Sequence, residues 1–80
     1  MNQPEIYERL QAIFRDLFDE PGLVLTADTT ARDVERWDSL SHVDMMVMVE
    51  EAFGIRFSTR EVTGLANVGA LAQVIERKAA

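Results

Sequence analysis

The spacing of the apolar residues limits the fold of this chain more than any other feature of its sequence. Residues 39–53 hold a strongly apolar run, and residues 68–75 hold a shorter one. No segment alternates apolar and polar residues as a half-buried strand would. In residues 3–18, five apolar side chains recur at helical spacing on one face: Ile6, Leu10, Ile13, Phe14 and Leu17. The sequence therefore predicts an all-α fold.

Stop and start signals mark the ends of the first two helices. Residues 19–22, Asp-Glu-Pro-Gly, end the first helix. Asp38 has the side chain that an N-cap needs, which places the start of the second helix at about Ser39. That helix continues to Phe53, and Gly54 suits the position after its end because glycine adopts a left-handed conformation readily.

Two further signals predict the remaining helices. Ser58 and Glu61 have the spacing of a capping box, so a short third helix should extend to about Leu65. Asn67 resembles the cap of a fourth helix. The apolar face of that helix contains Val68, Leu71, Ala72 and Ile75. We expect one domain, residues 1–80, folded as a four-helix bundle with a long loop between helices 1 and 2 and a short helix 3.

The connection over residues 20–37 is long for a compact domain and rich in Thr, Asp and Gly. Connections of this length are usually functional or wrapped over the core. The apolar residues 23–25, Leu-Val-Leu, are expected to attach it to the core. Thr30 and Asp33 have the spacing to cap one short helical turn that carries Val34.

Composition excludes several classes of function. The chain has 80 residues and no cysteine, so disulfides and thiolate metal sites are excluded, and any thiol must come from an attached group. The net charge of −6 argues against nucleic acid and favours basic protein partners. The longest apolar runs are far below the roughly 20 residues that span a bilayer. The N-terminus lacks the basic and apolar regions of a signal peptide, so we expect a cytoplasmic protein without membrane insertion.

Ser39 is the candidate functional residue. It lies where the polar loop meets the second helix, and a helix N-terminus has unpaired N–H groups and a positive dipole that favour a phosphate. No general base is evident beside it, so it is typical of a modification site rather than a nucleophile. His42 is the only histidine, and it is too isolated for a metal site. We therefore predict no catalytic residues and no metal site.

The second helix divides into two arcs at about 100° per residue. Five residues are expected to face the core: Met45, Met46, Val49, Ala52 and Phe53. Three apolar residues and three acids fall on the other side and are predicted to bind partners: Leu40, Val43, Val47, Asp44, Glu50 and Glu51. An outward apolar stripe edged by acids is typical of a docking surface. The alternative is that its apolar residues pack under the 20–37 connection.

Three segments resemble the acyl carrier proteins: Asp38-Ser39-Leu40, residues 50–55 (Glu-Glu-Ala-Phe-Gly-Ile) and Val68-Gly69. The resemblance covers about residues 5–77. It implies a four-helix bundle whose serine, here Ser39, is esterified with 4′-phosphopantetheine from coenzyme A by a separate transferase. It also implies that Asp38 matches the aspartate that helps to bind magnesium during this transfer, and that the helix after the serine recognises partners.

The resemblance implies that the chain is not an enzyme but a carrier of acyl intermediates, which are held as thioesters on the phosphopantetheine arm. It would deliver them to partner enzymes in fatty-acid, polyketide or other specialised acyl biosynthesis. The implied partners are a phosphopantetheinyl transferase and acyl-loading ligases or synthases with basic docking patches, and we expect a monomer. Trp37, Ser41 and His42 depart from the housekeeping fatty-acid carriers, which favours a specialised discrete type. The alternatives are a D-alanyl or aminoacyl carrier, and a helical adaptor without a prosthetic group.

Overall fold

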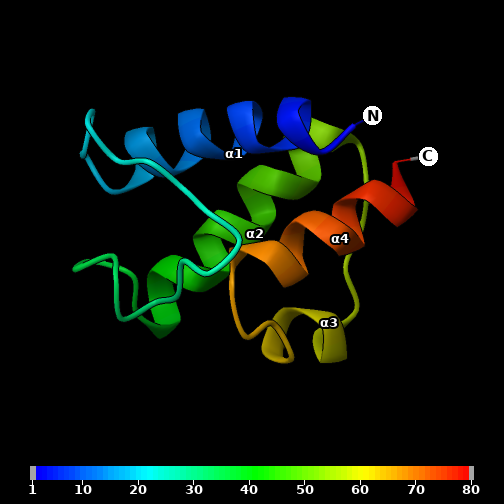
Figure 1. Cartoon of the computed structure of the whole chain (residues 1–80). Coiled ribbons are helices and arrows are strands. Elements are labelled where there is room, and N and C mark those ends of the chain that lie inside the picture. Colours follow the sequence, from blue (N-terminus) through cyan, green and yellow to red (C-terminus); the bar gives the residue numbers. More distant parts are fainter. Residues whose placement is uncertain (1, 80) are drawn as a thin grey trace.

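The computed structural model describes residues 2–79, which contain four helices and no strand. They are α1 (Gln3–Leu17), α2 (Ser39–Phe53), α3 (Thr59–Thr63) and α4 (Val68–Lys78). The helices α1, α2 and α4 form the body of the bundle, and the short α3 lies on the side away from α1 (Figure 1). The predicted all-α bundle with a short third helix is confirmed. Within residues 2–79, none of the helices has the length and apolarity needed to cross a membrane.

The helix ends follow from local side-chain caps. Asp38 and Ser58 each form a complete capping box, in which the cap side chain and the residue three positions later bond each other's backbone N–H. The Asn67 side chain accepts from the Ala70 N–H at 2.8 Å. The second helix ends at Phe53, and Gly54, which caps it, has a left-handed φ of 67°. The third helix ends at Thr63 rather than near Leu65, because Gly64 caps it.

The core is built from one face of each long helix. Buried apolar side chains come from α1, α2 and α4: Ile6, Leu10, Phe14, Met45, Met46, Val49, Val68, Leu71, Ala72 and Ile75. The prediction that Ala52 faces the core is wrong, since Ala52 is exposed. The buried arc of α2 is centred near Met46 and Val49, and Ala52 falls at the edge of that arc. A short methyl group at the edge of an arc does not reach the neighbouring helices.

The connection between α1 and α2 is attached to the bundle through both polar and apolar contacts. The Gln11 side chain accepts from the Leu25 N–H at 2.9 Å, and the Arg15 Nε donates to the Leu23 carbonyl at 2.7 Å. Leu25 is buried and Leu23 is partly buried. The expectation that Val24 also packs on the core is wrong, because its side chain is 66% exposed. Successive side chains of an extended segment point to opposite sides, so Val24 points outward between its neighbours.

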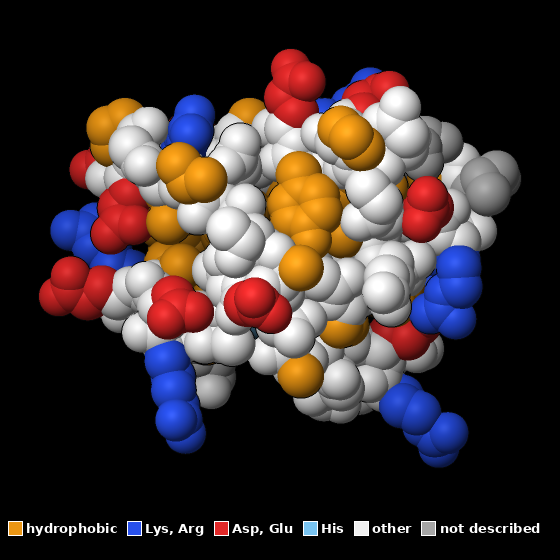
Figure 2. All heavy atoms as spheres, in the orientation of Figure 1, with side chains coloured by type: hydrophobic (Ala, Val, Ile, Leu, Met, Phe, Trp, Pro, Cys, Tyr) orange, Lys and Arg blue, Asp and Glu red, His pale blue; other side chains and the backbone are white. Residues whose placement is uncertain are grey.

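The predicted turn before α2 is present, although the structure assigns no helix to it. Thr30 N–H donates to Asp33 Oδ2 at 2.9 Å, and the Asp33 N–H donates to the Thr30 carbonyl at 2.9 Å. Val34, which follows this turn, is almost completely buried. On the face of the molecule drawn in Figure 2, the hydrophobic side chains form small separate patches between charged side chains, other side chains and backbone.

The start of α4 is bonded directly to the long connection. Val68 N–H donates to the Thr29 carbonyl at 2.8 Å, and Gly69 N–H donates to the Ala27 carbonyl at 2.9 Å. A Cβ on Gly69 would lie 2.9 Å from that same carbonyl oxygen and 3.0 Å from the Ala27 Cβ. The approach of these two backbones therefore requires glycine at residue 69.

Gly69→Ala should destabilise the fold, because the new methyl forces the Ala27 backbone away from α4. Overpacking of this kind costs roughly 1–3 kcal/mol. A loss of that size lowers the melting temperature of a small domain by about 4–24 °C, which thermal unfolding followed by circular dichroism measures. Gly22→Ala is the matched control, since nothing lies within 4 Å of a Cβ there. Equal melting temperatures for the two variants would contradict this role of Gly69.

Candidate functional site

Ser39 is the first residue of α2, and its side chain is exposed. The capping box holds the backbone around it. The Ser41 N–H donates to Asp38 Oδ1 at 2.9 Å, and the Asp38 N–H donates to the Ser41 hydroxyl at 2.8 Å. The Ser41 hydroxyl in turn donates to the Arg36 carbonyl at 2.9 Å. The Ser41 hydroxyl is thus used by the cap, whereas Ser39, at the positive end of the helix, is exposed and its hydroxyl makes no hydrogen bond within residues 2–79.

The cap also changes the acidity of Asp38. Hydrogen bonds from the Ser41 backbone N–H and then from its hydroxyl hold the pKa of the Asp38 carboxyl below its usual value. The pKa of Glu61 is lowered in the same way, first by the Ser58 N–H and then by Lys78. Both charged carboxylates therefore stabilise the start of a helix at neutral pH.

These shifts predict a loss of stability in acid. A carboxyl whose folded pKa lies below its unfolded pKa contributes stability above the unfolded value, and this contribution disappears as the pH falls through the folded value. For Asp38 the loss should therefore begin near pH 4 and continue below it. Asp38→Asn should leave the neutral melting temperature nearly unchanged, because asparagine also caps helices, and should reduce the decline between pH 5 and pH 3. An identical decline in both proteins would contradict the assignment.

Trp37 fixes the end of the long connection just before Ser39. Its ring meets Phe14 edge-on, with centroids 5.2 Å apart, and lies 6.3 Å from the Phe18 ring. Phe14 and Phe18 are buried, so Trp37 attaches the connection to the core of the bundle. The Trp37 backbone N–H also donates to the Val34 carbonyl at 3.0 Å. These contacts determine where Ser39 emerges from the bundle.

His42 makes contacts that sequence patterns did not reveal. Its ring stacks on Trp37 with an interplanar angle of 19°, and Trp37 Nε1–H donates to His42 Nδ1 at 3.0 Å. His42 Nε2 lies 2.8 Å from the Val62 carbonyl oxygen on α3. Because Nδ1 accepts a hydrogen bond, the neutral ring carries its proton on Nε2 and donates it to Val62. The five-residue spacing of Trp37 and His42 was the only signal of this contact.

A groove of about 540 Å³ opens beside Ser39. Its lining comes from the end of the connection, the first turn of α2, and α3 with the segment after it. Trp37 and His42 line it together with Val62 and Leu65, and Ser39 is also part of its wall. The groove is therefore lined mainly by apolar side chains, and the hydrogen bond between His42 and Val62 joins its α2 side to its α3 side.

The outward stripe on α2 is exposed along its length. Leu40 is 80% exposed, Val43 54% and Val47 46%. The alternative, that these residues pack under the 20–37 connection, is therefore wrong. Asp44 and Glu51 are exposed beside them. Leu40, Val43, Val47, Asp44 and Glu51 are together called the α2 face below.

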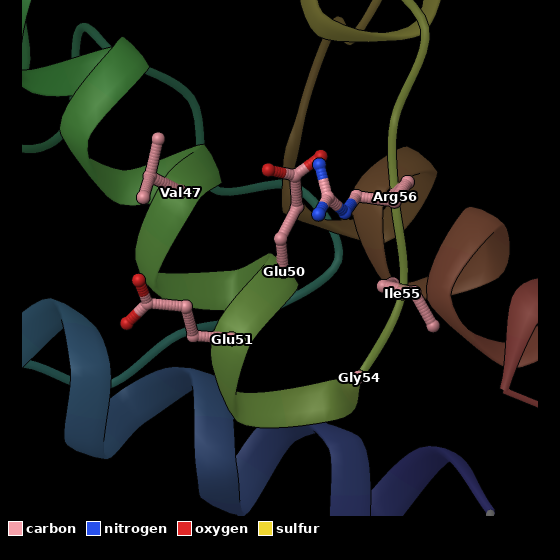
Figure 3. Close-up of a pocket in the computed structure, with 6 residues that line it drawn as sticks. All are labelled: Val47, Glu50, Glu51, Gly54, Ile55 and Arg56. Atoms are coloured by element: carbon pink, nitrogen blue, oxygen red, sulfur yellow. The ribbon is translucent and has the colours of Figure 1, made fainter.

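Glu50 differs from the other predicted docking acids. It is half-buried, and its Oε2 accepts from the Phe57 N–H at 2.7 Å, so this carboxylate holds the segment after α2. A hollow of about 450 Å³ lies between the last turns of α2 and that segment. Figure 3 shows Val47 and Glu51 projecting from α2 and Arg56 projecting from the segment beyond Gly54. The Glu50 hydrogen bond is a second feature that periodicity did not reveal.

The sequence model of the family described as "Phosphopantetheine attachment site" matches residues 8–75 of this chain. That match spans most of the bundle, from α1 to α4. The chain belongs to the acyl carrier protein family. Acyl carrier proteins hold acyl groups on a covalently attached phosphopantetheine, so the predicted carrier role and prosthetic group are confirmed.

Curated relatives and a solved structure agree with this assignment. The acyl carrier protein of Thermosynechococcus vestitus is 35% identical over 81 residues, which cover 100% of this chain and 99% of the relative. The acyl carrier protein of Saccharopolyspora erythraea is 26% identical over 69 residues, covering 86% and 73%. The solution NMR structure of the holo acyl carrier protein from Geobacter metallireducens is 41% identical, with a TM-score of 0.85, and covers 91% of this carrier and 84% of that chain.

Proposed function

We propose that Ser39 is the residue to which phosphopantetheine is attached, through a phosphodiester at its Oγ. The observation that carries this proposal is the exposed hydroxyl at the first position of a 15-residue helix, beside an open groove. A phosphate there lies next to the N–H groups of the first helical turn and the positive end of the helix dipole. The chain fits the group chemically, because nothing covers the hydroxyl and the neighbouring Ser41 hydroxyl is used by the cap.

The group supplies a thiol, which this cysteine-free chain lacks, and acyl intermediates are carried on it as thioesters. The chain itself positions and presents the arm. Trp37 and the capping box hold Ser39 at the end of α2, and the flexible arm raises the effective concentration of its cargo at a docked enzyme. Catalysis then belongs to the partner enzymes, because within residues 2–79 no side-chain base is hydrogen-bonded to Ser39, and both ring nitrogens of the nearby His42 are engaged by Trp37 and Val62.

Asp38 is proposed to assist the attachment step by helping to hold the magnesium ion. Its carboxylate is exposed, it directly precedes Ser39, and its lowered pKa keeps it charged at neutral pH. Carboxylate oxygens are preferred ligands for magnesium. The capping bonds orient the carboxylate, since Oδ1 is held by the Ser41 N–H.

The attachment is tested by the intact mass of the purified chain after incubation with coenzyme A, magnesium and a broad-specificity phosphopantetheinyl transferase. One phosphopantetheine increment is expected. A control carrier in the same tube shows that the transferase is active. If the control is modified and this chain keeps its starting mass, the proposal is contradicted.

We infer that partner enzymes dock on the α2 face. The face combines exposed apolar side chains with acids, and no lysine or arginine occurs from Asp38 to Ile55. Partners with basic patches and a small apolar contact would fit it, among them the transferase and acyl-loading ligases or synthases. Charge steering of this type gives fast association, which suits a carrier that visits several enzymes.

Asp44→Lys should weaken docking of the transferase, because a positive charge then meets a basic patch. Each exposed charge contact is worth about 1 kcal/mol or less, so we expect the KM for the carrier to rise about twofold to fivefold at low salt. The rise should shrink at high salt, where the charges are screened. Glu8→Lys on α1 makes the same change of net charge away from the α2 face and is the control. Equal KM values for both variants would contradict docking at this face.

The residues around Ser39 favour a carrier that serves a specialised biosynthetic pathway over one that serves housekeeping fatty-acid synthesis. Trp37 and His42 are large aromatic side chains that line the groove beside the attachment residue. A D-alanyl or aminoacyl carrier is the alternative within the same family. Loading assays with ligases for amino acids and for fatty acids distinguish these clients.

A further inference from the structure

The short helix α3 is attached to α2 by very few contacts. It has five residues, and none of them is fully buried. The His42 bond to the Val62 carbonyl, 2.8 Å long, is the only hydrogen bond that joins α2 to α3 within residues 2–79. On its other side, α3 is held by an ion pair of 3.1 Å between Glu61 and Lys78, whose side chains are partly exposed. Apart from the packing of Val62 on the core and the Glu50 bond to the Phe57 N–H just before α3, His42 is what holds α3 against α2.

Trp37 makes His42 a rigid support. The Trp37 Nε1–H bond to His42 Nδ1 and the stacking of the two rings fix the imidazole in one orientation and one tautomer. Trp37 is itself packed against Phe14 and Phe18 of the core. The chain of contacts from the core through Trp37 and His42 to Val62 is called the Trp37–His42 latch below.

The latch lies in the groove beside Ser39. Ser39, His42 and Val62 line the same groove, whose apolar walls would attract a hydrocarbon chain. A long acyl chain that enters between α2 and α3 has to separate His42 from Val62. The separated N–H and carbonyl would then face hydrocarbon without a partner, which disfavours the inserted state by roughly tenfold or more.

We propose that the Trp37–His42 latch determines which acyl groups this carrier shelters. It keeps α3 on α2 and so keeps long apolar chains out of the space between the two helices, and the carrier suits short or polar acyl groups that remain in solvent. This inference rests on the attachment of the arm at Ser39. It deepens the proposed function by naming a substrate class and the two side chains that select it.

The test compares two cargoes on three proteins. The transferase attaches acetyl- or octanoyl-phosphopantetheine from the corresponding acyl-coenzyme A, and intact mass verifies each product first. The proteins are the unmutated chain, His42→Leu, which cannot bond Val62, and His42→Gln, whose amide N–H can. The measured quantity is the rate at which hydroxylamine removes each acyl group, relative to the same thioester on free pantetheine.

The latch predicts a dependence on chain length that appears only in His42→Leu. Octanoyl should be removed about tenfold more slowly from His42→Leu than from the unmutated chain, with acetyl rates within about twofold of each other. His42→Gln should behave like the unmutated chain. Two results would overturn the proposal. In the first, octanoyl is removed as slowly from the unmutated chain as from His42→Leu; in the second, octanoyl on His42→Leu is removed as fast as from free pantetheine.

A second measurement needs no variant and covers the case in which His42→Leu fails to fold. Amide NMR shifts of Val62 and Leu65 in the unmutated chain should be the same with acetyl and with octanoyl cargo. Large shifts on going to octanoyl mean that the longer chain has entered beside α3, which overturns the latch while leaving Ser39 attachment intact. A missing mass increment in every protein refutes the attachment at Ser39, and the latch inference with it.

Discussion

Ser39→Ala should abolish the phosphopantetheine increment completely, while the unmutated chain gains one increment. The alanine removes the only atom to which the arm is proposed to be attached. The backbone should keep its structure, because the capping box is formed by Asp38 and Ser41 and does not use the Ser39 side chain. The intact mass after transferase treatment, with circular dichroism to verify folding, measures this result.

Ser41→Ala is the matched control for this experiment. Ser41 is two residues away on the same helical turn, and its hydroxyl donates to the Arg36 carbonyl instead of pointing into solvent. The variant should lose part of the cap and some stability, and it should still gain the increment. If Ser41→Ala fails to gain the increment while remaining folded and Ser39→Ala gains it, the two serines have been assigned the wrong way round.

Phe14→Ala should have the largest effect on stability. Phe14 is fully buried and contacts the rings of both Phe18 and Trp37. Replacing a buried phenylalanine with alanine costs about 3–5 kcal/mol. A domain of 80 residues has a total stability of only about 4–12 kcal/mol. Urea denaturation should therefore show that the free energy of unfolding of Phe14→Ala in water is close to zero.

The same variant connects the core to the functional site. Trp37 is the only tryptophan, so its fluorescence reports the end of the connection before Ser39. Loss of the Phe14 ring should loosen Trp37, and its emission should move to longer wavelength even in the folded fraction. Ile13→Ala is the control, since Ile13 is adjacent in sequence and only partly buried. Equal losses of stability for both variants would contradict the central place of Phe14.

The helices and their caps were predictable because their causes are local. A capping box joins residues three positions apart, so the spacing of Ser58 and Glu61 already specified the start of α3. The exposed Ser39 follows from the same logic, since Asp38 caps the helix that Ser39 begins. The resemblance to acyl carrier proteins then supplied the chemistry, which helix periodicity alone does not contain.

The contacts that were not predictable join residues far apart in the chain. The close approach of Gly69 to Ala27 and the bond from His42 to Val62 depend on how the helices pack, which no local pattern encodes. Glu50 looked like a docking acid because only its place on the helix was visible, whereas its partner, the Phe57 N–H, lies beyond the end of α2.

Tandem mass spectrometry of the modified chain identifies the residue that carries the phosphopantetheine. After incubation with coenzyme A, magnesium and the transferase, the peptide that contains Ser39 and Ser41 is fragmented to locate the added mass. We expect the phosphopantetheine on Ser39 alone. An added mass on Ser41 or on any other residue, with Ser39 unmodified, would contradict it.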